Sequence, residues 1–123
     1  MLVLIVDDDA RSASLLARML RGDGYETEVA NDGASAIARL TRDPLPDAVI
    51  SELHLPHADG LAVARYARSR RPGTAILFLT AHPHALESTA AWSGAPVLLL
   101  TKPVDYAALL VHLSAPLGAA RVP

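Results

Sequence analysis

The stretch LVLIVDDD, residues 2–9, indicates the fold class of this 123-residue chain. It consists of an apolar run, Leu2–Val6, followed at once by three aspartates. A continuous apolar run of this length is typical of a strand that is covered on both faces in a parallel sheet. Ligands of such sheets bind beyond the carboxyl ends of the strands. The aspartates therefore stand where a ligand site is expected.

Further strand-like runs follow at regular spacing, namely Glu26–Ala30, Ala48–Ser51, Ala75–Leu79 and Val97–Leu100. All except the first of these are nearly continuous in apolar residues. The run Glu26–Ala30 instead alternates polar and apolar residues, so we expect it to be an edge strand.

Segments with helical spacing separate these runs. The first carries an apolar stripe of Leu15, Leu16, Met19 and Leu20. Gly22 and Gly24 signal its end. The others are marked by Ala34, Ile37 and Ala38, by Leu61, Ala64 and Ala67, by Leu86, Ala90 and Ala91, and by Tyr106, Leu109, Leu110 and Leu113 after a candidate N-cap, Asp105.

Strand alternating with helix five times predicts one α/β domain, a doubly wound (βα)5 fold with right-handed crossovers. Pro116, Gly118 and Pro123 are typical of a linker or a frayed end. We therefore expect the domain to occupy residues 1–115 and a linker-like tail to occupy residues 116–123.

The composition narrows the possible functions. Hydrophobic residues make up 51% and charged residues 20%, as in ordinary globular proteins. The absence of cysteine excludes a disulfide framework, thiolate zinc ligands and a cysteine nucleophile. A net charge of −2 without a basic run argues against direct binding of nucleic acid. The apolar runs, such as Pro96–Leu100, are too short to cross a membrane and no signal peptide is visible, so we expect a cytoplasmic protein.

Polar residues stand at the carboxyl ends of the predicted strands: Asp7, Asp8, Asp9, Glu52, Thr80 and Lys102. Neighbouring aspartates repel one another unless a cation or a lysine compensates. Carboxylates with a loop carbonyl suit Mg²⁺. A hydroxyl and an ammonium group can hold a phosphoryl group. Asp9 has a simpler explanation as the N-cap of the first helix.

The motifs VDDD (residues 6–9), PDAVISELHLPHADG (46–60), LTA (79–81) and TKP (101–103) occur in this order. Together they resemble the receiver domains of response regulators in two-component systems, over about residues 1–115. The resemblance implies a flavodoxin-like sheet of five parallel strands in the order 2-1-3-4-5.

The resemblance also implies a metal site. Asp7 and Asp8 would hold Mg²⁺ directly or through water, with the side chain of Glu52 and the carbonyl of His54 as further ligands. The side chains of His54 and His82 would overlook the pocket. They are either exposed loop histidines or groups that respond to pH or bind metal.

A phosphate pocket is implied as well. Thr80 would be the switch hydroxyl, and Lys102 the pocket lysine that precedes a cis-proline, Pro103. Leu99 stands where the family usually has a tyrosine or phenylalanine that reports the state of the threonine. Leucine lacks the ring and hydroxyl, so this step is altered, and Leu99 as plain strand packing is the simpler interpretation.

Glu52 is the main departure from the family pattern, because the phosphoacceptor position normally carries aspartate. The extra methylene moves the carboxylate by roughly 1 Å, and such a misplacement can cost on the order of 100-fold in a positioned reaction. We therefore expect impaired phosphorylation. Glu52 partly imitates a phosphoryl group, although with one charge instead of nearly two.

These observations predict a receiver domain that acts as a protein-interaction switch and not as an enzyme. The expected partner is a sensor histidine kinase or another signalling protein. A homodimer through the face formed by the fourth helix, the fifth strand and the fifth helix is a further hypothesis. Nucleic acid would be bound only through a separate output domain.

Two alternatives remain open at this point. One is a conventional receiver that accepts the phosphoryl group on Glu52. The other is a phosphotransferase of the haloacid-dehalogenase type, whose first motif Asp7 and Asp9 superficially match. Arg11 stands where that motif has threonine or valine, and no acidic pair follows Lys102.

Overall fold

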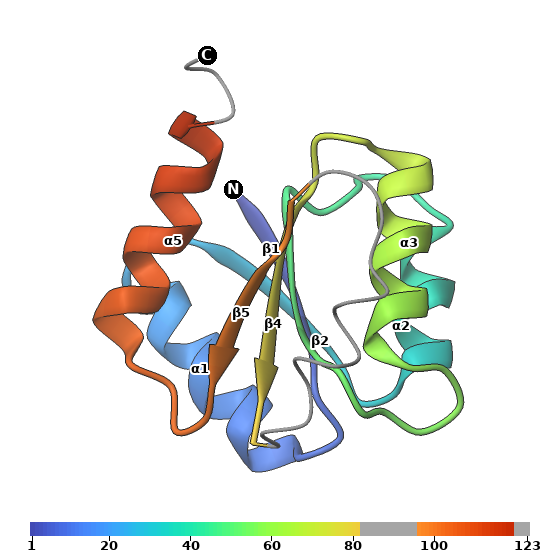
Figure 1. The fold of residues 1–123 in the computed structure, drawn as a ribbon, viewed down its shortest axis with the longest axis horizontal. Coiled ribbons are helices and arrows are strands. Elements are labelled where there is room, and N and C mark those ends of the chain that lie inside the picture. The colour runs from blue at the N-terminus through green and yellow to red at the C-terminus, as the bar shows by residue number, and fades with distance from the viewer. Residues whose placement is uncertain (82–95, 120–123) are drawn as a thin grey trace.

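A computed structural model describes residues 1–81 and 96–119, with side chains as far as residue 114. Its strands form one parallel sheet in the order β2-β1-β3-β4-β5, which confirms the predicted fold and strand order. Figure 1 shows α1 and α5 on one face of the sheet and α2 and α3 on the other. The bounds are β1 (Leu2–Val6), α1 (Ala10–Gly22), β2 (Glu26–Ala30), α2 (Gly33–Leu40), β3 (Ala48–Glu52), α3 (Gly60–Arg70), β4 (Ala75–Thr80), β5 (Leu98–Thr101) and α5 (Tyr106–Ala119).

The burial of the strands follows their place in the sheet. Every residue of β1, β3 and β4 is buried, because these strands are central and helices cover both faces. In β2 only Ala30 is buried, which confirms that Glu26–Ala30 is an edge strand.

Two apolar layers form the core. Alternate residues of β1 point to opposite faces of the sheet. Val3 and Ile5 pack with buried residues of α1 and α5. Leu4 and Val6 pack on the other face with α2, α3 and Phe78, which is the largest fully buried side chain among the described residues. The continuous apolar run of β1 thus supplies side chains to both layers of the core.

The expected stripe of α1 is partly wrong. Leu16 and Leu20 are buried as expected, but Leu15 is 58% exposed and Met19 36% exposed. The buried face is Ala13, Leu16, Ala17 and Leu20. Ala13 and Ala17 are small and share this face with Leu16 and Leu20, so the buried face is narrow and the large side chains beside it remain outside.

Two other expectations concern the second half of the chain. The helix marked by Leu86, Ala90 and Ala91 lies outside the described residues. Helix α5 continues to Ala119, beyond the residue at which we expected the tail to begin.

Aspartates begin all the described helices. The side chains of Asp9, Asp32, Asp59 and Asp105 accept hydrogen bonds from backbone N–H groups of α1, α2, α3 and α5. This confirms Asp105 as an N-cap and supports the simpler explanation of Asp9. Each helix therefore starts at the carboxyl edge of the sheet, with its first N–H groups satisfied.

At the opposite edge of the sheet, the side chain of Asp47 connects neighbouring elements by hydrogen bonds. Its Oδ2 accepts the N–H of Leu2 at 2.8 Å, and its Oδ1 accepts Nη1 of Arg71 at 2.8 Å. Burial raises the pKa of Asp47, but the bond from Leu2 and the bond and charge of Arg71 outweigh it, so the pKa lies below its ordinary value of 3.8. The charged carboxylate thus connects β1, β3 and the end of α3.

The loop between β3 and α3 lies tightly against the starts of α2 and α3. The N–H of Gly60 donates to the carbonyl of Leu53 at 2.8 Å, and that of Gly33 to the carbonyl of Pro56 at 3.1 Å. A Cβ atom at Gly60 would lie 2.3 Å from the carbonyl oxygen of Glu52. Only a hydrogen fits there, so glycine allows this loop to follow Glu52 so closely.

The Asp47→Asn variant tests the role of this carboxylate. Because the pKa is lowered in the folded chain, the charge stabilises the fold above roughly pH 4, and that contribution is lost as the pH falls through the lowered value. We expect urea unfolding at pH 7 to show a loss of about 1 kcal/mol, which shrinks toward pH 3. Glu26→Gln on the exposed edge strand is the matched control, expected to change stability by less than about 0.5 kcal/mol. An equal loss for D47N at both pH values would contradict this.

The Gly60→Ala variant tests the close approach of the loop. Overpacking against backbone atoms is expected to lower the free energy of unfolding by about 2 kcal/mol or more. Gly22→Ala is the control, since a Cβ there would meet nothing within 4 Å, and alanine is favoured in a helix by up to about 1 kcal/mol. Chemical denaturation compares the two, and equal stabilities would show that the loop adapts.

Candidate functional site

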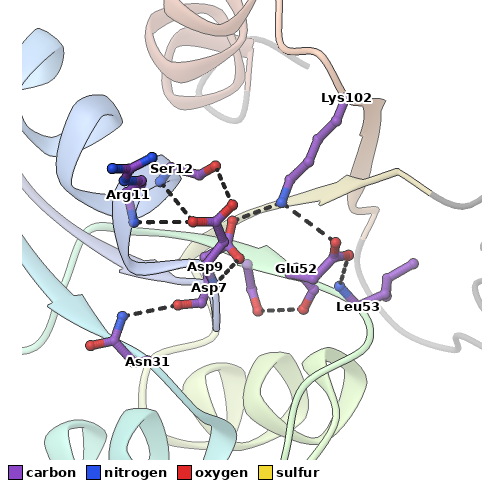
Figure 2. Close-up of polar contacts among 9 residues, drawn as sticks. Asp7, Asp9, Arg11, Ser12, Asn31, Glu52, Leu53 and Lys102 are labelled. Atoms are coloured by element: carbon purple, nitrogen blue, oxygen red, sulfur yellow. Dashed lines mark hydrogen bonds and ion pairs between the residues drawn. The ribbon is translucent and has the colours of Figure 1, made fainter.

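A charged cluster lies at the carboxyl edge of the sheet and consists of Asp7, Glu52 and Lys102 (Figure 2). Nζ of Lys102 lies 2.8 Å from Oδ2 of Asp7 and 3.5 Å from Oε1 of Glu52. Asp7 and Glu52 are each only 6% exposed. Their charges are therefore largely removed from water and compensated by one ammonium group.

Asp7 is held in place by the end of the neighbouring strand β2 and by its own loop. Its Oδ1 accepts the N–H of Asp9 at 2.9 Å. Its backbone N–H donates to the carbonyl of Ala30 at 3.1 Å, and its carbonyl accepts Nδ2 of Asn31 at 3.0 Å. Asn31 was not expected at the site, although it follows β2 just as Asp7 follows β1. A polar residue at a strand end was the available signal.

Glu52 is turned back on its own chain. Its Oε2 accepts the backbone N–H of Leu53 at 2.7 Å, while Oε1 faces Lys102. Its carbonyl accepts the hydroxyl of Ser51 at 2.8 Å. Both carboxylate oxygens of Glu52 are thus engaged within the site.

Lys102 follows β5 and is attached to β4 through the backbone, since its N–H donates to the carbonyl of Thr80 at 2.7 Å. The peptide bond to Pro103 is cis, as expected. Burial lowers the pKa of Lys102, but the hydrogen bond and charge of Asp7, followed by Glu52, outweigh it and raise the pKa above 10.5. The ammonium is therefore charged at neutral pH and faces both carboxyl groups.

Thr80 and Leu99 lie beside this cluster on β4 and β5. Thr80 is the last residue of β4 and is fully buried. Leu99 pairs in register with Phe78 and packs, half-buried, against the core on the α2 and α3 side. This placement supports the simpler interpretation of Leu99 as strand packing, whereas a role of either residue in switching stays a prediction.

The other expected site residues lie at the periphery. Asp8 and His54 are exposed. Asp9 caps α1 through bonds to the N–H groups of Arg11 and Ser12. Asp7, Glu52 and Lys102 are the expected site residues whose side chains meet in the cluster. His82 lies outside the described residues.

The cluster does not fit Mg²⁺ as it is arranged. Carboxylate oxygens are the right donors for this ion. However, the described residues contain no group of three histidine or acidic side chains placed to hold a metal. Each oxygen of Asp7 and Glu52 already faces an N–H group or the ammonium of Lys102. A metal would first have to displace one of these partners.

A cleft of about 600 Å³ leads from this cluster along α1 toward the start of α5. Its apolar wall includes Leu15, Met19 and Val104, next to Tyr106. The hydroxyl of Tyr106 donates to Oδ2 of Asp23 at 2.6 Å, which joins α5 to the end of α1. The exposed apolar residues of α1 thus belong to the surface that surrounds the site.

Comparisons with known proteins agree with this geometry. The family model for the response regulator receiver domain matches residues 3–114. The chain is 38% identical over 115 residues to response regulator MprA of Mycobacterium leprae, which covers 94% of this chain and 50% of that protein. It is 36% identical over 107 residues to the transcriptional regulatory protein GlrR of Escherichia coli, which covers 87% of this chain and 24% of that protein. The chain therefore spans about half the length of MprA.

Solved structures are similar over nearly the whole chain. The response regulator receiver protein from Sinorhizobium medicae matches with a TM-score of 0.88 at 29% identity, over 97% of this chain and 95% of that one. The chemotaxis protein CheY4 of Vibrio cholerae matches with a TM-score of 0.79 at 30% identity, over 93% and 96%.

None of the helices in the described part of the chain has the length and apolar character needed to cross a membrane. The fold, the residues at the carboxyl edge of the sheet and the match over residues 3–114 all agree. The chain therefore belongs to the response regulator receiver domains of two-component signalling.

Proposed function

We propose that this domain is an atypical receiver that switches through protein contacts and accepts phosphoryl groups poorly. The observation that carries the proposal is the position of Glu52 at the end of β3, buried and directed toward Lys102. This position keeps the family's pocket but presents a longer carboxylate in it. The domain is thus a binding module and not a turnover enzyme.

The hydrogen bonds of Glu52 support poor reactivity. A carboxylate that attacks a phosphoryl donor needs a free oxygen aimed at phosphorus. Oε2 of Glu52 is instead bonded to the N–H of Leu53 at 2.7 Å, and Oε1 faces Lys102. Attack requires breaking one of these contacts, in addition to the misplacement caused by the extra methylene.

The same contacts support a permanent, partial imitation of the phosphorylated state. The negative charge of Glu52 lies toward Lys102 even when no phosphoryl donor is present. Glutamate carries one charge where a phosphoryl group carries nearly two, so the imitation is incomplete. A partner that reads the surface of the domain would then set the balance between its states.

A sensor histidine kinase or another signalling protein is the proposed partner. Leu15 and Met19 are exposed on α1 and line the cleft that leads to Glu52. A partner that reaches the site from this side would bury them. Binding to nucleic acid is assigned to an output domain separate from residues 3–114.

Phosphorylation is tested with a small phosphodonor and Mg²⁺, followed by intact mass measurement. We expect the wild-type chain to gain a phosphoryl group at least about 100-fold more slowly than Glu52→Asp, because aspartate restores the shorter carboxylate. Glu52→Gln is the negative control. A wild-type adduct that forms as fast as the adduct of E52D, and is absent from E52Q, would establish a conventional receiver that uses Glu52.

A homodimer through the face of β5 and α5 is a second proposal, to which the predicted fourth helix would also contribute. Val111 on α5 is 59% exposed. We expect sedimentation at increasing concentration to show a dimer that Val111→Glu weakens about tenfold or more. Leu15→Glu, at a residue of similar exposure on α1, should leave the dimer intact. A wild-type chain that stays monomeric, or a dimer lost only in L15E, would contradict this.

A further inference from the structure

The cleft beside α1 reaches as far as the sheet. It has a volume of about 600 Å³ and lies between α1 and the connection from β5 to α5. Its floor includes Ile5 of β1, Ile50 of β3 and Leu79 of β4, which are only 2%, 1% and 6% exposed. Sites for small molecules have volumes of roughly 300–1,000 Å³ and are mostly apolar. This cleft therefore has the size and depth of a small-molecule site, and a flat protein surface could not reach its floor.

The rim of the cleft is apolar as well. Leu15 and Met19 of α1 line it and are 58% and 36% exposed. Pro103 and Val104 line it in the connection that precedes α5. An apolar molecule in this space would remove Leu15 and Met19 from water and would gain dispersion contacts with the surrounding side chains. The large apolar residues that α1 exposes thus have a use in ligand binding.

Polar side chains line the two ends of the cleft, and they already have partners within the chain. At one end, Asp7 and Glu52 face the ammonium of Lys102 and accept backbone N–H groups. At the other end, the hydroxyl of Tyr106 donates to Oδ2 of Asp23 at 2.6 Å. These groups are therefore satisfied by the protein itself.

Ser12 is the remaining polar residue among the described residues that line the cleft. Its hydroxyl donates to Oδ2 of Asp9 at 3.0 Å. A charged ligand would have to displace one of these partners, and it would also lose part of its hydration between apolar walls. An uncharged apolar ligand leaves all of these pairs intact. The cleft therefore favours molecules without charge.

We propose that this cleft is a binding site for a small, uncharged apolar molecule, held between α1 and the connection from β5 to α5. Leu15 and Met19 cover the ligand at the rim, and Ile5, Ile50 and Leu79 contact it from the sheet. The site goes beyond the proposed function and does not rest on it, because neither a phosphoryl group nor a partner protein takes part in the binding.

Binding is tested by titrating the wild-type chain with indole, after labelling the methionine methyl groups with ¹³C. The chain has two methionines, Met1 and Met19, which are similarly exposed at 37% and 36%, and of these only Met19 is among the described residues that line the cleft. The ring current of a bound indole shifts the NMR signal of a methyl group that it contacts. We expect the Met19 signal to shift until it saturates and the Met1 signal to stay in place. A Met19 signal that does not move up to the solubility limit of indole, or equal shifts of both signals, would overturn the proposal.

The preference for an uncharged ligand is tested with tryptamine and indole-3-acetate, which carry the same ring with a positive and a negative charge. We expect both to reach half-saturation of the Met19 shift at concentrations at least about tenfold higher than indole, because the charged group loses hydration in the cleft. If either ion binds as tightly as indole, the charged end of the cleft recognises the ligand and the proposal is wrong.

The rim contact is tested with Leu15→Gln, which replaces an exposed apolar side chain by a polar one of similar size. We expect the half-saturation concentration of indole to rise about fourfold or more, the effect of roughly one buried methylene group. Val111→Gln is the matched control, since Val111 is 59% exposed and is not among the described lining residues. Equal affinities of L15Q and V111Q would contradict the proposal. A Met19 signal that changes on dilution of the ligand-free chain would also contradict it, by identifying a second copy of the chain as the occupant.

Discussion

Two carboxylates are buried at the carboxyl edge of this sheet, and the arrangement depends on the single ammonium group between them. Asp7 and Glu52 end neighbouring strands, so the parallel register places them close together. Two buried carboxylates on neighbouring strands repel each other and lose their hydration. Lys102 follows β5, which neighbours neither β1 nor β3. Its ammonium faces both carboxylates and connects the β5 edge of the sheet to the centre.

The backbone around this cluster restricts the positions that the two carboxylates can adopt. Asp7 is fixed by the N–H of Asp9, and Glu52 by the N–H of Leu53. Gly60 lets the following loop pass directly over the carbonyl of Glu52. A glutamate in this enclosed place has little freedom to move its longer side chain away from the lysine. Glu52 is therefore held by its neighbours at the position that the family resemblance assigns to the phosphoacceptor.

A compact lysine ammonium suits the position between the two carboxylates better than an arginine guanidinium would. The chain has 11 basic residues besides histidine, of which only Lys102 is a lysine. Several of the arginines bind backbone carbonyls instead, as Arg39 does at Pro44 and Arg70 at Leu40. A guanidinium is planar and has directed donors, so it braces loops well. An ammonium is a compact point charge with three donors, and here it faces both Asp7 and Glu52.

Much of the fold was predictable because its signals are local. Continuous apolar runs identify central strands, and alternation identified β2 as the edge. The motifs at the strand ends predicted that Asp7, Glu52 and Lys102 lie together, since parallel strands bring their carboxyl ends to one edge. The missed details depended on distant contacts. Leu15 and Met19 looked like core, but the buried face of α1 consists of Ala13, Leu16, Ala17 and Leu20.

The sequence by itself determined the strand and helix order, the aspartate caps and the identity of the residues at the carboxyl edge, because each is encoded within a few neighbouring positions. Only the tertiary structure decided how these residues pair. Lys102 is 95 positions from Asp7 and lies closer to it than to Glu52. Asn31, 24 positions from Asp7, completes the shell from the end of β2. Distances between strand ends follow from sheet register and helix packing, and those depend on the whole core.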